Sequence, residues 1–172
     1  MSDKYAALAD TIKIEDITSN EINQKVLRRL KDNDPSFIKL YIIKQKLNGD
    51  CDYIPGYGEY VPIDGEDIGW LGYYIGQNTT LQTLLFGLGY ETIDDKSFYE
   101  EMNCNKSIKE IKFYETSLIG SIFQILDSFL KNNSLNKFSV HSCLTGAGCL
   151  HQLMALTIGG CSKFSETYCN YR

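Results

Sequence analysis

The sequence lacks the long apolar segments that carry a protein into or across a membrane. No window approaches the roughly 18 apolar residues that a membrane-spanning helix requires. The N-terminal stretch MSDKYAALADTIKIEDI carries acidic residues early and contains no apolar run of signal-peptide length. We therefore expect a cytoplasmic protein that does not bind membranes, with the nucleus as an alternative location. Without an export signal, the six cysteines are expected to be free thiols rather than three disulfides.

Concentrated positive charge is also scarce. The chain has 17 basic and 22 acidic residues, which gives a formal net charge of -5. Its only basic segment is KVLRRLK at residues 25–31, where Arg28 and Arg29 are expected on the solvent side of a helix. This distribution argues against binding to nucleic acid.

Signatures of enzymes are missing as well. The sequence contains no HExxH, GxSxG or GxGxxG motif and no convincing pair of catalytic acids. The glycines of LTGAG at residues 144–148 are not followed by the lysine of a phosphate-binding loop. We therefore expect a non-enzymatic protein that uses no cofactor and no metal.

What the sequence does contain is an internal repeat. Its 172 residues, 43% hydrophobic and 23% charged, are typical of one globular domain. The segments NTTLQTLLF, NKSIKEIKF and NNSLNKFSV begin at Asn78, Asn105 and Asn132, which are 27 residues apart. A weaker copy, DPSFIKLYI, occupies residues 34–42. The recurring N-x-S/T sequence is a glycosylation motif, but we interpret it here as turn and strand-start chemistry.

Each copy combines the period of a strand with that of a helix. Apolar residues recur at positions 1, 4 and 6, and the alternation of the last two predicts a short strand with one buried face. Farther along each unit, apolar residues recur at intervals of three and four, which predicts a helix. The helix is expected to end at the next asparagine, a residue that tolerates the left-handed conformation. The apolar triads are Phe37, Leu40 and Ile42; Leu81, Leu84 and Phe86; Ile108, Ile111 and Phe113; and Leu135, Phe138 and Val140.

This strand–turn–helix–turn unit resembles the leucine-rich repeat, L-x-x-L-x-L-x-x-N/C-x-L, in its helix-containing, ribonuclease-inhibitor-like form. The resemblance covers roughly residues 34–160. It implies an α/β solenoid, a short horseshoe with a parallel sheet on the concave side and helices on the convex side. The expected units span residues 34–77, 78–104, 105–131 and 132–160, followed by a degraded fifth unit or tail at residues 161–172.

Residues 1–33 are expected to form an N-terminal cap of a strand and a helix. The segment TIKIEDI at residues 11–17 could supply an edge strand. The following helix, within residues 21–33, is expected to turn four apolar residues inward: Ile22, Val26, Leu27 and Leu30.

The first unit is longer than the others. Its triad begins 44 residues before the next one instead of 27, and the surplus falls in a segment rich in glycine, proline and tyrosine. That composition predicts an inserted loop over residues 48–63. Tyr53, Tyr57 and Tyr60 would give the loop a surface of the kind enriched at interfaces. The alternative is a tolerated insertion whose tyrosines pack on the neighbouring helix.

The stretch VHSCL at residues 140–144 places a base beside two nucleophiles. The resemblance implies instead that Cys143 is structural, at a position where the side chain satisfies backbone groups after the strand, with Thr116 and Gln45 as counterparts. Adjacent strand residues point to opposite faces, so His141 and Ser142 are not expected to form a nucleophile–base pair. A zinc site is the alternative, although its spacing matches no familiar zinc pattern. Its ligands would be His141, Cys143, Cys149 and His151.

The function we expect is protein–protein interaction through the concave strand face. Positions 3, 5 and 7 of each unit project from that face, and Tyr41, Leu85 and Tyr114 would form an apolar stripe flanked by charges, as at specific partner sites. The protein partner is of unknown identity, and the chain is either a monomer or part of a longer array. Two alternatives are an activator of a small GTPase and a structural fragment of a larger array. The expected contact residues are Lys39, Tyr41, Ile43, Leu85, Glu110, Lys112, Tyr114, Lys137, Ser139 and His141, with Tyr53, Tyr57 and Tyr60 from the loop.

Overall fold

The structure of the protein, a computed structural model, describes residues 3–43, 58–63, 66–88, 93, 95–118, 135–141, 144–145 and 164–167. Its helices are α1 (Asp3–Leu8), α2 (Ile14–Ile17), α3 (Glu21–Lys31), α4 (Gly69–Gln77) and α5 (Lys96–Met102). Its strands are β1 (Lys39–Ile43), β2 (Gly58–Tyr60), β3 (Thr83–Gly87), β4 (Glu110–Tyr114), β5 (Ser117–Leu118), β6 (Lys137–His141), β7 (Leu144–Thr145) and β8 (Phe164–Thr167). None of the helices in this part of the chain has the length and apolar character needed to cross a membrane.

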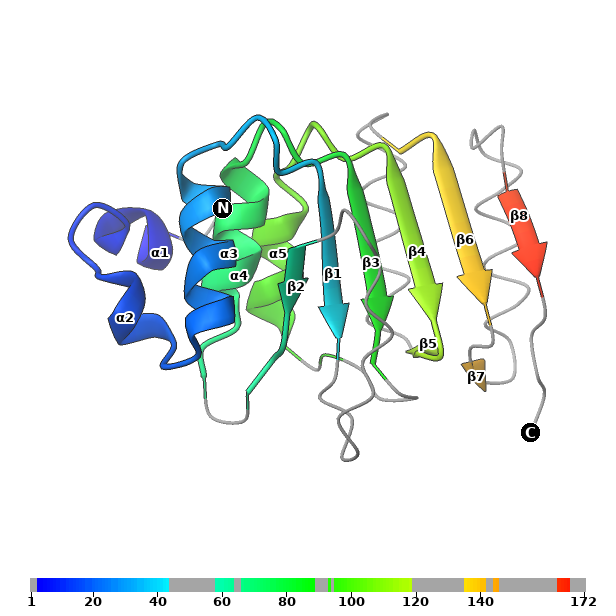
Figure 1. Ribbon diagram of the computed structural model, residues 1–172, viewed down its shortest axis with the longest axis horizontal. Coiled ribbons are helices and arrows are strands. Elements are labelled where there is room, and N and C mark those ends of the chain that lie inside the picture. Colours follow the sequence, from blue (N-terminus) through cyan, green and yellow to red (C-terminus); the bar gives the residue numbers. More distant parts are fainter. Residues whose placement is uncertain are drawn as a thin grey trace.

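Six strands form one parallel sheet in the order β2-β1-β3-β4-β6-β8 (Figure 1). The pairing follows the repeat, because Thr83 pairs with Glu110 and Glu110 with Lys137, each 27 residues on. Lys39 pairs with Thr83, 44 residues on, as the longer first unit predicts. The expected α/β class, a parallel sheet with helices, is therefore confirmed. Strand β8 continues the sheet beside β6, within the range where a degraded fifth unit is expected.

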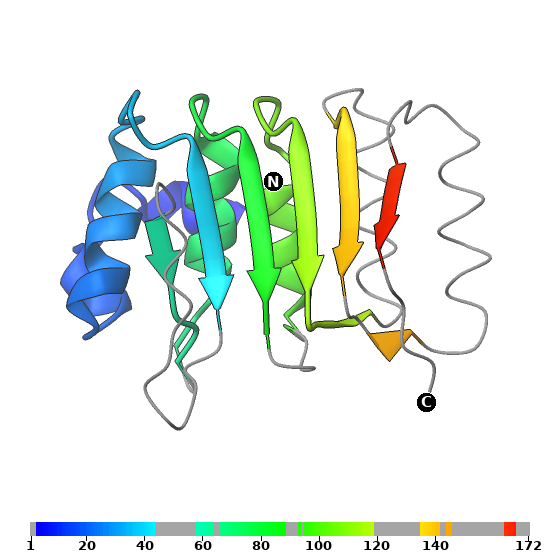
Figure 2. The same cartoon turned by 45° about the vertical axis from the view of Figure 1, so that its right-hand side comes forward.

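The hydrophobic core lies between the sheet and the helices α3, α4 and α5 (Figure 2). All four apolar triads are buried in it, as the alternation predicts. Phe86 and Phe113, which occupy the same position in successive units, stack with ring centroids 5.0 Å apart. Helices α4 and α5 pack closely because Gly76 has no side chain; an added Cβ there would collide with the backbone oxygen of Glu101. Each unit thus buries its apolar face against its neighbours.

A buried asparagine at the start of the third unit joins that unit to the two before it. Asn105 Nδ2 donates to the carbonyl oxygens of Ile75 and Asn78, at 2.6 and 2.7 Å. Asn105 Oδ1 accepts from the backbone N–H groups of Ser107 and Ile108, at 2.7 and 2.8 Å. One amide therefore satisfies open carbonyls near the end of a helix and open N–H groups before a strand, all away from water.

Asn78 repeats this arrangement one unit earlier. Its Nδ2 donates to the Leu30 carbonyl at 2.9 Å, and its Oδ1 accepts from the N–H groups of Thr80 and Leu81 at 3.0 and 2.7 Å. The expectation that asparagine stands here for a left-handed backbone is wrong, because Asn78 has an extended backbone with φ -73° and ψ 136°. The side chain is the reason for the asparagine. Because Nδ2 is buried and occupied in both Asn78 and Asn105, turn chemistry accounts for the N-x-S/T sequence at these two positions.

The hydroxyl two positions after Asn78 and after Asn105 adds a second link between units. Ser107 Oγ donates to the carbonyl oxygens of Leu81 and Asn78, at 2.7 and 3.2 Å. Thr80 Oγ1 donates to the carbonyl oxygen of Asp34 at 3.1 Å. In the second and third units, the serine or threonine therefore satisfies a carbonyl group of the preceding unit at the turn before the strand.

The buried Thr116 plays the structural part expected for its repeat position. Its Oγ1 donates to the Phe86 carbonyl at 3.2 Å and accepts from the Leu88 N–H at 3.3 Å. The hydroxyl thus satisfies backbone groups at the end of β3, in the unit before its own. Its counterparts Gln45 and Cys143 lie outside the described residues, so their expected role stays a prediction.

The first unit has an aspartate where later units have asparagine. Asp34 Oδ1 accepts from the Ser36 N–H at 2.8 Å and the Ser36 hydroxyl at 2.7 Å, and Oδ2 accepts from Arg29 at 2.7 Å. These hydrogen bonds, from Ser36 and then Arg29, lower the pKa of Asp34 from 3.8 to about 2. A carboxylate only accepts hydrogen bonds, so it could not replace Asn78, which must also donate to the Leu30 carbonyl.

The N-terminal segment differs from the expected strand and helix. The edge strand expected over residues 11–17 is wrong, because Ile14–Ile17 form α2 and bury Ile14 and Ile17 on one side of a helical turn. Ile14 and Ile17, three positions apart, share one face of a helix, whereas only Ile12 and Ile14 have the two-residue spacing of a strand. Tyr5 of α1 completes this cap, since its hydroxyl donates to Asp67 Oδ1 at 2.8 Å beside the start of α4.

The edge of the sheet beyond β1 is occupied by β2, which belongs to the expected loop. Gly58–Tyr60 pair in parallel with β1, Leu40 opposite Gly58 and Ile42 opposite Tyr60. The loop expectation for residues 48–63 is therefore wrong at β2. Sequence composition pointed to a loop because a three-residue strand beside glycine and proline has no period long enough to recognise.

Asn23 of α3 holds the strand β2 in place. Its Nδ2 donates to the Val61 carbonyl at 2.7 Å, and its Oδ1 accepts from the Val61 N–H at 2.9 Å. Asn23 is fully buried, whereas the neighbouring Ile22 is 52% exposed. The expectation that Ile22 points inward is wrong, because the inward face of α3 is shifted by one residue to accommodate this amide. Val26, Leu27 and Leu30 are buried as predicted.

Replacement of Asn105 by alanine tests the asparagine links. Asn105→Ala leaves two carbonyls and two N–H groups without their partner in a buried place, so we expect a loss of about 2–4 kcal/mol in the free energy of unfolding. Urea unfolding followed by circular dichroism measures it. Asn136→Ala is the matched control, since Asn136 is exposed, and its effect should stay within about 0.5 kcal/mol. Equal losses for the two variants would contradict the assignment.

Candidate protein-binding face of the sheet

One face of the sheet turns away from α3, α4 and α5, and we call it the front face. Strand residues alternate between the two faces, and the buried triads occupy the helix side. The front face therefore holds the residues at positions 3, 5 and 7, as the repeat predicts, and the parallel register aligns them in three rows. These residues are Lys39, Tyr41 and Ile43 on β1; Thr83, Leu85 and Gly87 on β3; Glu110, Lys112 and Tyr114 on β4; and Lys137, Ser139 and His141 on β6.

The half of the front face over β1 and β3 is closed. Tyr41, Ile43 and Leu85 are 9%, 5% and 7% exposed and form a hydrophobic cluster of their own, with Val61 packed against it. The Tyr41 ring lies over Gly87 of the next strand, where a side chain would collide with it. The expectation that Tyr41 and Leu85 form an exposed apolar stripe with Tyr114 is therefore wrong. These side chains stabilise the sheet by packing against one another and are not accessible to a binding partner.

The half over β4 and β6 is polar and centred on Glu110. The Glu110 carboxylate pairs with Lys137 at 2.9 Å and with Lys112 at 3.3 Å. Partial burial alone would raise the pKa of Glu110, but the hydrogen bond from Lys137 and the charge of Lys112 outweigh it, so the pKa lies below its ordinary value of 4.5. Thr83 Oγ1 lies 3.5 Å from the same carboxylate and extends this network to β3. Both lysines of this half are therefore neutralised.

An exposed tyrosine marks the C-terminal end of this polar half. Tyr114 is 43% exposed, and the register places it opposite the half-buried His141. The Glu115 N–H donates to the His141 carbonyl at 3.0 Å, which ties the two strand ends together. Ser139, in the middle row, is buried and offers almost no surface to a partner. The structure thus brings together Glu110, Lys112, Tyr114, Lys137 and His141 as one accessible group.

Of the three loop tyrosines expected to contact a partner, the structure describes only Tyr60. Tyr60 is buried in the main core, so its expected role in a contact surface is wrong. Burial, and then the negative charge of Glu66, raise the pKa of Tyr60 above its ordinary value. Tyr53 and Tyr57 lie outside the described residues and remain predictions. The same holds for Cys143, Cys149 and His151 of the alternative zinc site.

Sequence reasoning missed Val61, which packs on the closed half of the front face. The only signal for it is the pair Tyr60–Val61, because neighbouring strand residues reach opposite faces of a sheet. Tyr60 accordingly enters the main core and Val61 the front-face cluster. A two-residue apolar pattern next to a proline is too short to predict a strand.

Comparisons with known proteins support the fold but not a family. No protein-family model matches the sequence, and no curated protein matches it. The structure is similar to the solved structure of Leiomodin-1 Actin-Binding Site 2 (ABS2), with a TM-score of 0.53 and 19% sequence identity. The match covers 87% of this chain and 81% of that chain. At this identity the likeness concerns the fold alone.

Replacing Glu110 by glutamine tests the charge network of the front face. A carboxyl group whose pKa is lowered by folding contributes stability above its unfolded pKa and loses it as the pH falls through the folded value. We therefore expect Glu110→Gln to cost about 0.5–1 kcal/mol at pH 7, a range typical of ion pairs near the surface, and less at pH 3. Urea unfolding at both pH values measures the difference. An equal cost at pH 7 and pH 3 would contradict the ion pairs.

Proposed function

We propose that the chain is a leucine-rich-repeat solenoid of the ribonuclease-inhibitor-like class and a non-enzymatic protein-binding module. The 27-residue register of the parallel strands supports the solenoid, as does the alternation of strands with the helices α4 and α5. The likeness to a solved structure is compatible with it. A rigid parallel sheet with one face turned away from its helices is well suited to present side chains to a partner without rearranging.

The accessible group at β4 and β6 carries this proposal. Tyr114 is the one front-face aromatic residue in the described strands that is well exposed, at 43%. Tyrosine buries a large, rigid surface at low entropic cost and is enriched among residues that dominate binding energy. The charges of Lys137 and Glu110 beside it provide a polar rim. The contact surface we propose therefore centres on Tyr114 and His141 and excludes the closed half.

The proposed partner is a protein, and actin is the first to test. The similar solved structure is that of an actin-binding site of leiomodin-1. For this chain, actin is a candidate on that ground alone, because a shared fold does not establish a shared function. The surface on which the proposal depends is the same for any protein partner.

Binding assays on the complete chain test the proposal. The chain is used as bait for proteins from a cell extract and, separately, is sedimented with actin filaments. We expect Tyr114→Ala to weaken the captured interaction about tenfold, since a central tyrosine typically contributes more than 1 kcal/mol. The matched control is Ile22→Ala, which removes another exposed apolar side chain, from α3. The proposal fails if Tyr114→Ala and Ile22→Ala bind every captured partner as the unmodified chain does.

A further inference from the structure

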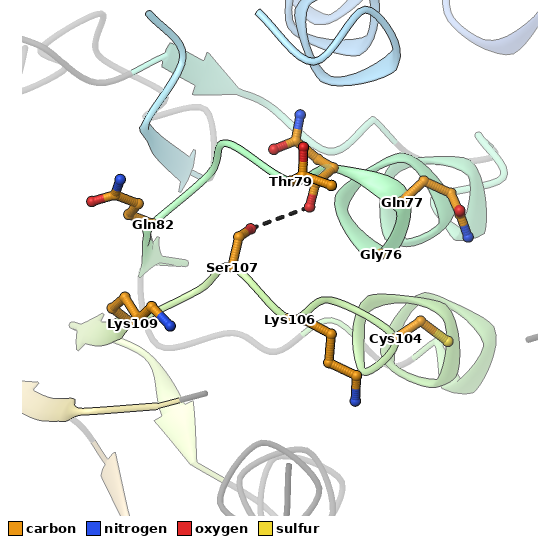
Figure 3. A pocket seen from close by; sticks show the side chains of 9 residues that line it. Gly76, Gln77, Thr79, Gln82, Cys104, Lys106, Ser107 and Lys109 are labelled. Atoms are coloured by element: carbon orange, nitrogen blue, oxygen red, sulfur yellow. Dashed lines mark hydrogen bonds between the residues drawn. The ribbon is translucent and has the colours of Figure 1, made fainter. Parts of the chain in front are cut away.

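A shallow pocket lies at the edge of the sheet where the strands begin. It has a volume of about 510 Å³, within the usual range of ligand sites. Figure 3 shows that its wall comes from two successive turns and the helix end before the first, with Gln77 at the end of α4 and Thr79 and Gln82 on the turn before β3. Lys106 and Lys109 lie on the turn before β4, on either side of Ser107.

The charge of this pocket is opposite to that of the chain. The chain carries a formal net charge of -5, yet none of the 9 residues that line the pocket is acidic. Lys106 and Lys109 are exposed, and neither forms an ion pair with an acidic side chain in the described part of the chain. On the front face, by contrast, Glu110 neutralises two lysines. Among the described residues, the pocket therefore places two lysines without an acidic partner next to the front face.

The polar groups of the pocket divide into occupied and available ones. The Ser107 hydroxyl donates to the carbonyl oxygens of Leu81 and Asn78, so it is already used in the hydrogen bonds between the second and third units. The ammonium groups of Lys106 and Lys109 remain available to a ligand, as does the side chain of the exposed Gln82. All three groups donate hydrogen bonds, and ammonium groups bind carboxylates most strongly.

We propose that this pocket holds an acidic side chain of the protein partner. The inference rests on the proposed function, because the pocket adjoins the front face: Gln82 precedes Thr83 of β3, and Lys109 precedes Glu110 of β4. A partner chain that crosses Tyr114 can place an aspartate or glutamate against the two lysines at the other end of the strands. The partner segment is therefore acidic, and its charge complements the pocket rather than the whole protein.

A fluorescent decaglutamate peptide is the probe for this pocket, and fluorescence anisotropy measures its binding to the complete chain. The net negative charge of the chain opposes non-specific binding of this peptide, so an attraction must be local. We expect binding that weakens as salt is added. Lys106→Gln with Lys109→Gln should weaken it about fivefold or more, from the loss of two surface ion pairs. The matched control is Lys13→Gln with Lys25→Gln, two exposed lysines outside the sheet, which should leave the binding within about twofold.

Cys104 provides a second readout, because this residue lines the same pocket and has a free thiol. Bound decaglutamate should slow alkylation of Cys104 by iodoacetamide, measured by mass spectrometry on the fragment that contains this residue. No binding at about 1 mM peptide would overturn the proposal, as would equal effects of the two lysine pairs or unprotected Cys104. Loss of partner binding by Tyr114→Ala together with any of these results would overturn the pocket and leave the proposed function intact.

Discussion

The fold depends on a side-chain amide buried between neighbouring units. Parallel strands linked by helices leave carbonyl groups open at each helix end and N–H groups open before each strand, and stacking removes both from water. Asn105 satisfies both sets at once, two carbonyls with its nitrogen and two N–H groups with its oxygen. The hydroxyl of Ser107 adds a further link. This need for one group that both donates and accepts hydrogen bonds explains why asparagine recurs at the start of the units. The first unit starts with Asp34 instead, whose carboxylate only accepts hydrogen bonds.

The sequence was sufficient to predict the central strands, because the links between units have a fixed spacing. Asparagines 27 residues apart fixed the register of β3, β4 and β6, and the triad of the first unit placed β1. The elements at the N-terminal edge of the sheet could not be predicted in this way. No repeat constrains β2, which is held by its pairing with β1, by the burial of Tyr60 and by the amide of Asn23. Ile12 and Ile14 have the spacing of a strand and Ile14 and Ile17 that of a helical turn, and packing decides between them.

The sequence predicted which residues lie on the front face, but not which of them are accessible to a partner. The period of two correctly assigned Tyr41, Leu85 and Tyr114 to one face. Whether a residue on that face meets solvent depends on neighbours from other parts of the chain, such as Val61 against the Tyr41 cluster. The face is consequently divided into a closed apolar half and an accessible half around Tyr114 and Glu110. The lysines of the pocket extend the accessible half toward the start of the strands, so that the proposed partner meets an aromatic anchor and a separate basic anchor.

Hydrogen exchange of asparagine side-chain amides, followed by NMR, tests this account most directly. The NH₂ groups of Asn78 and Asn105 are buried and donate to backbone carbonyls of the N-terminal cap and of preceding units, respectively. Their protons are therefore predicted to exchange as slowly as the backbone amides of β3 and β4, because release requires separation of the units. Exchange as fast as that of the exposed Asn136 side chain would contradict the account.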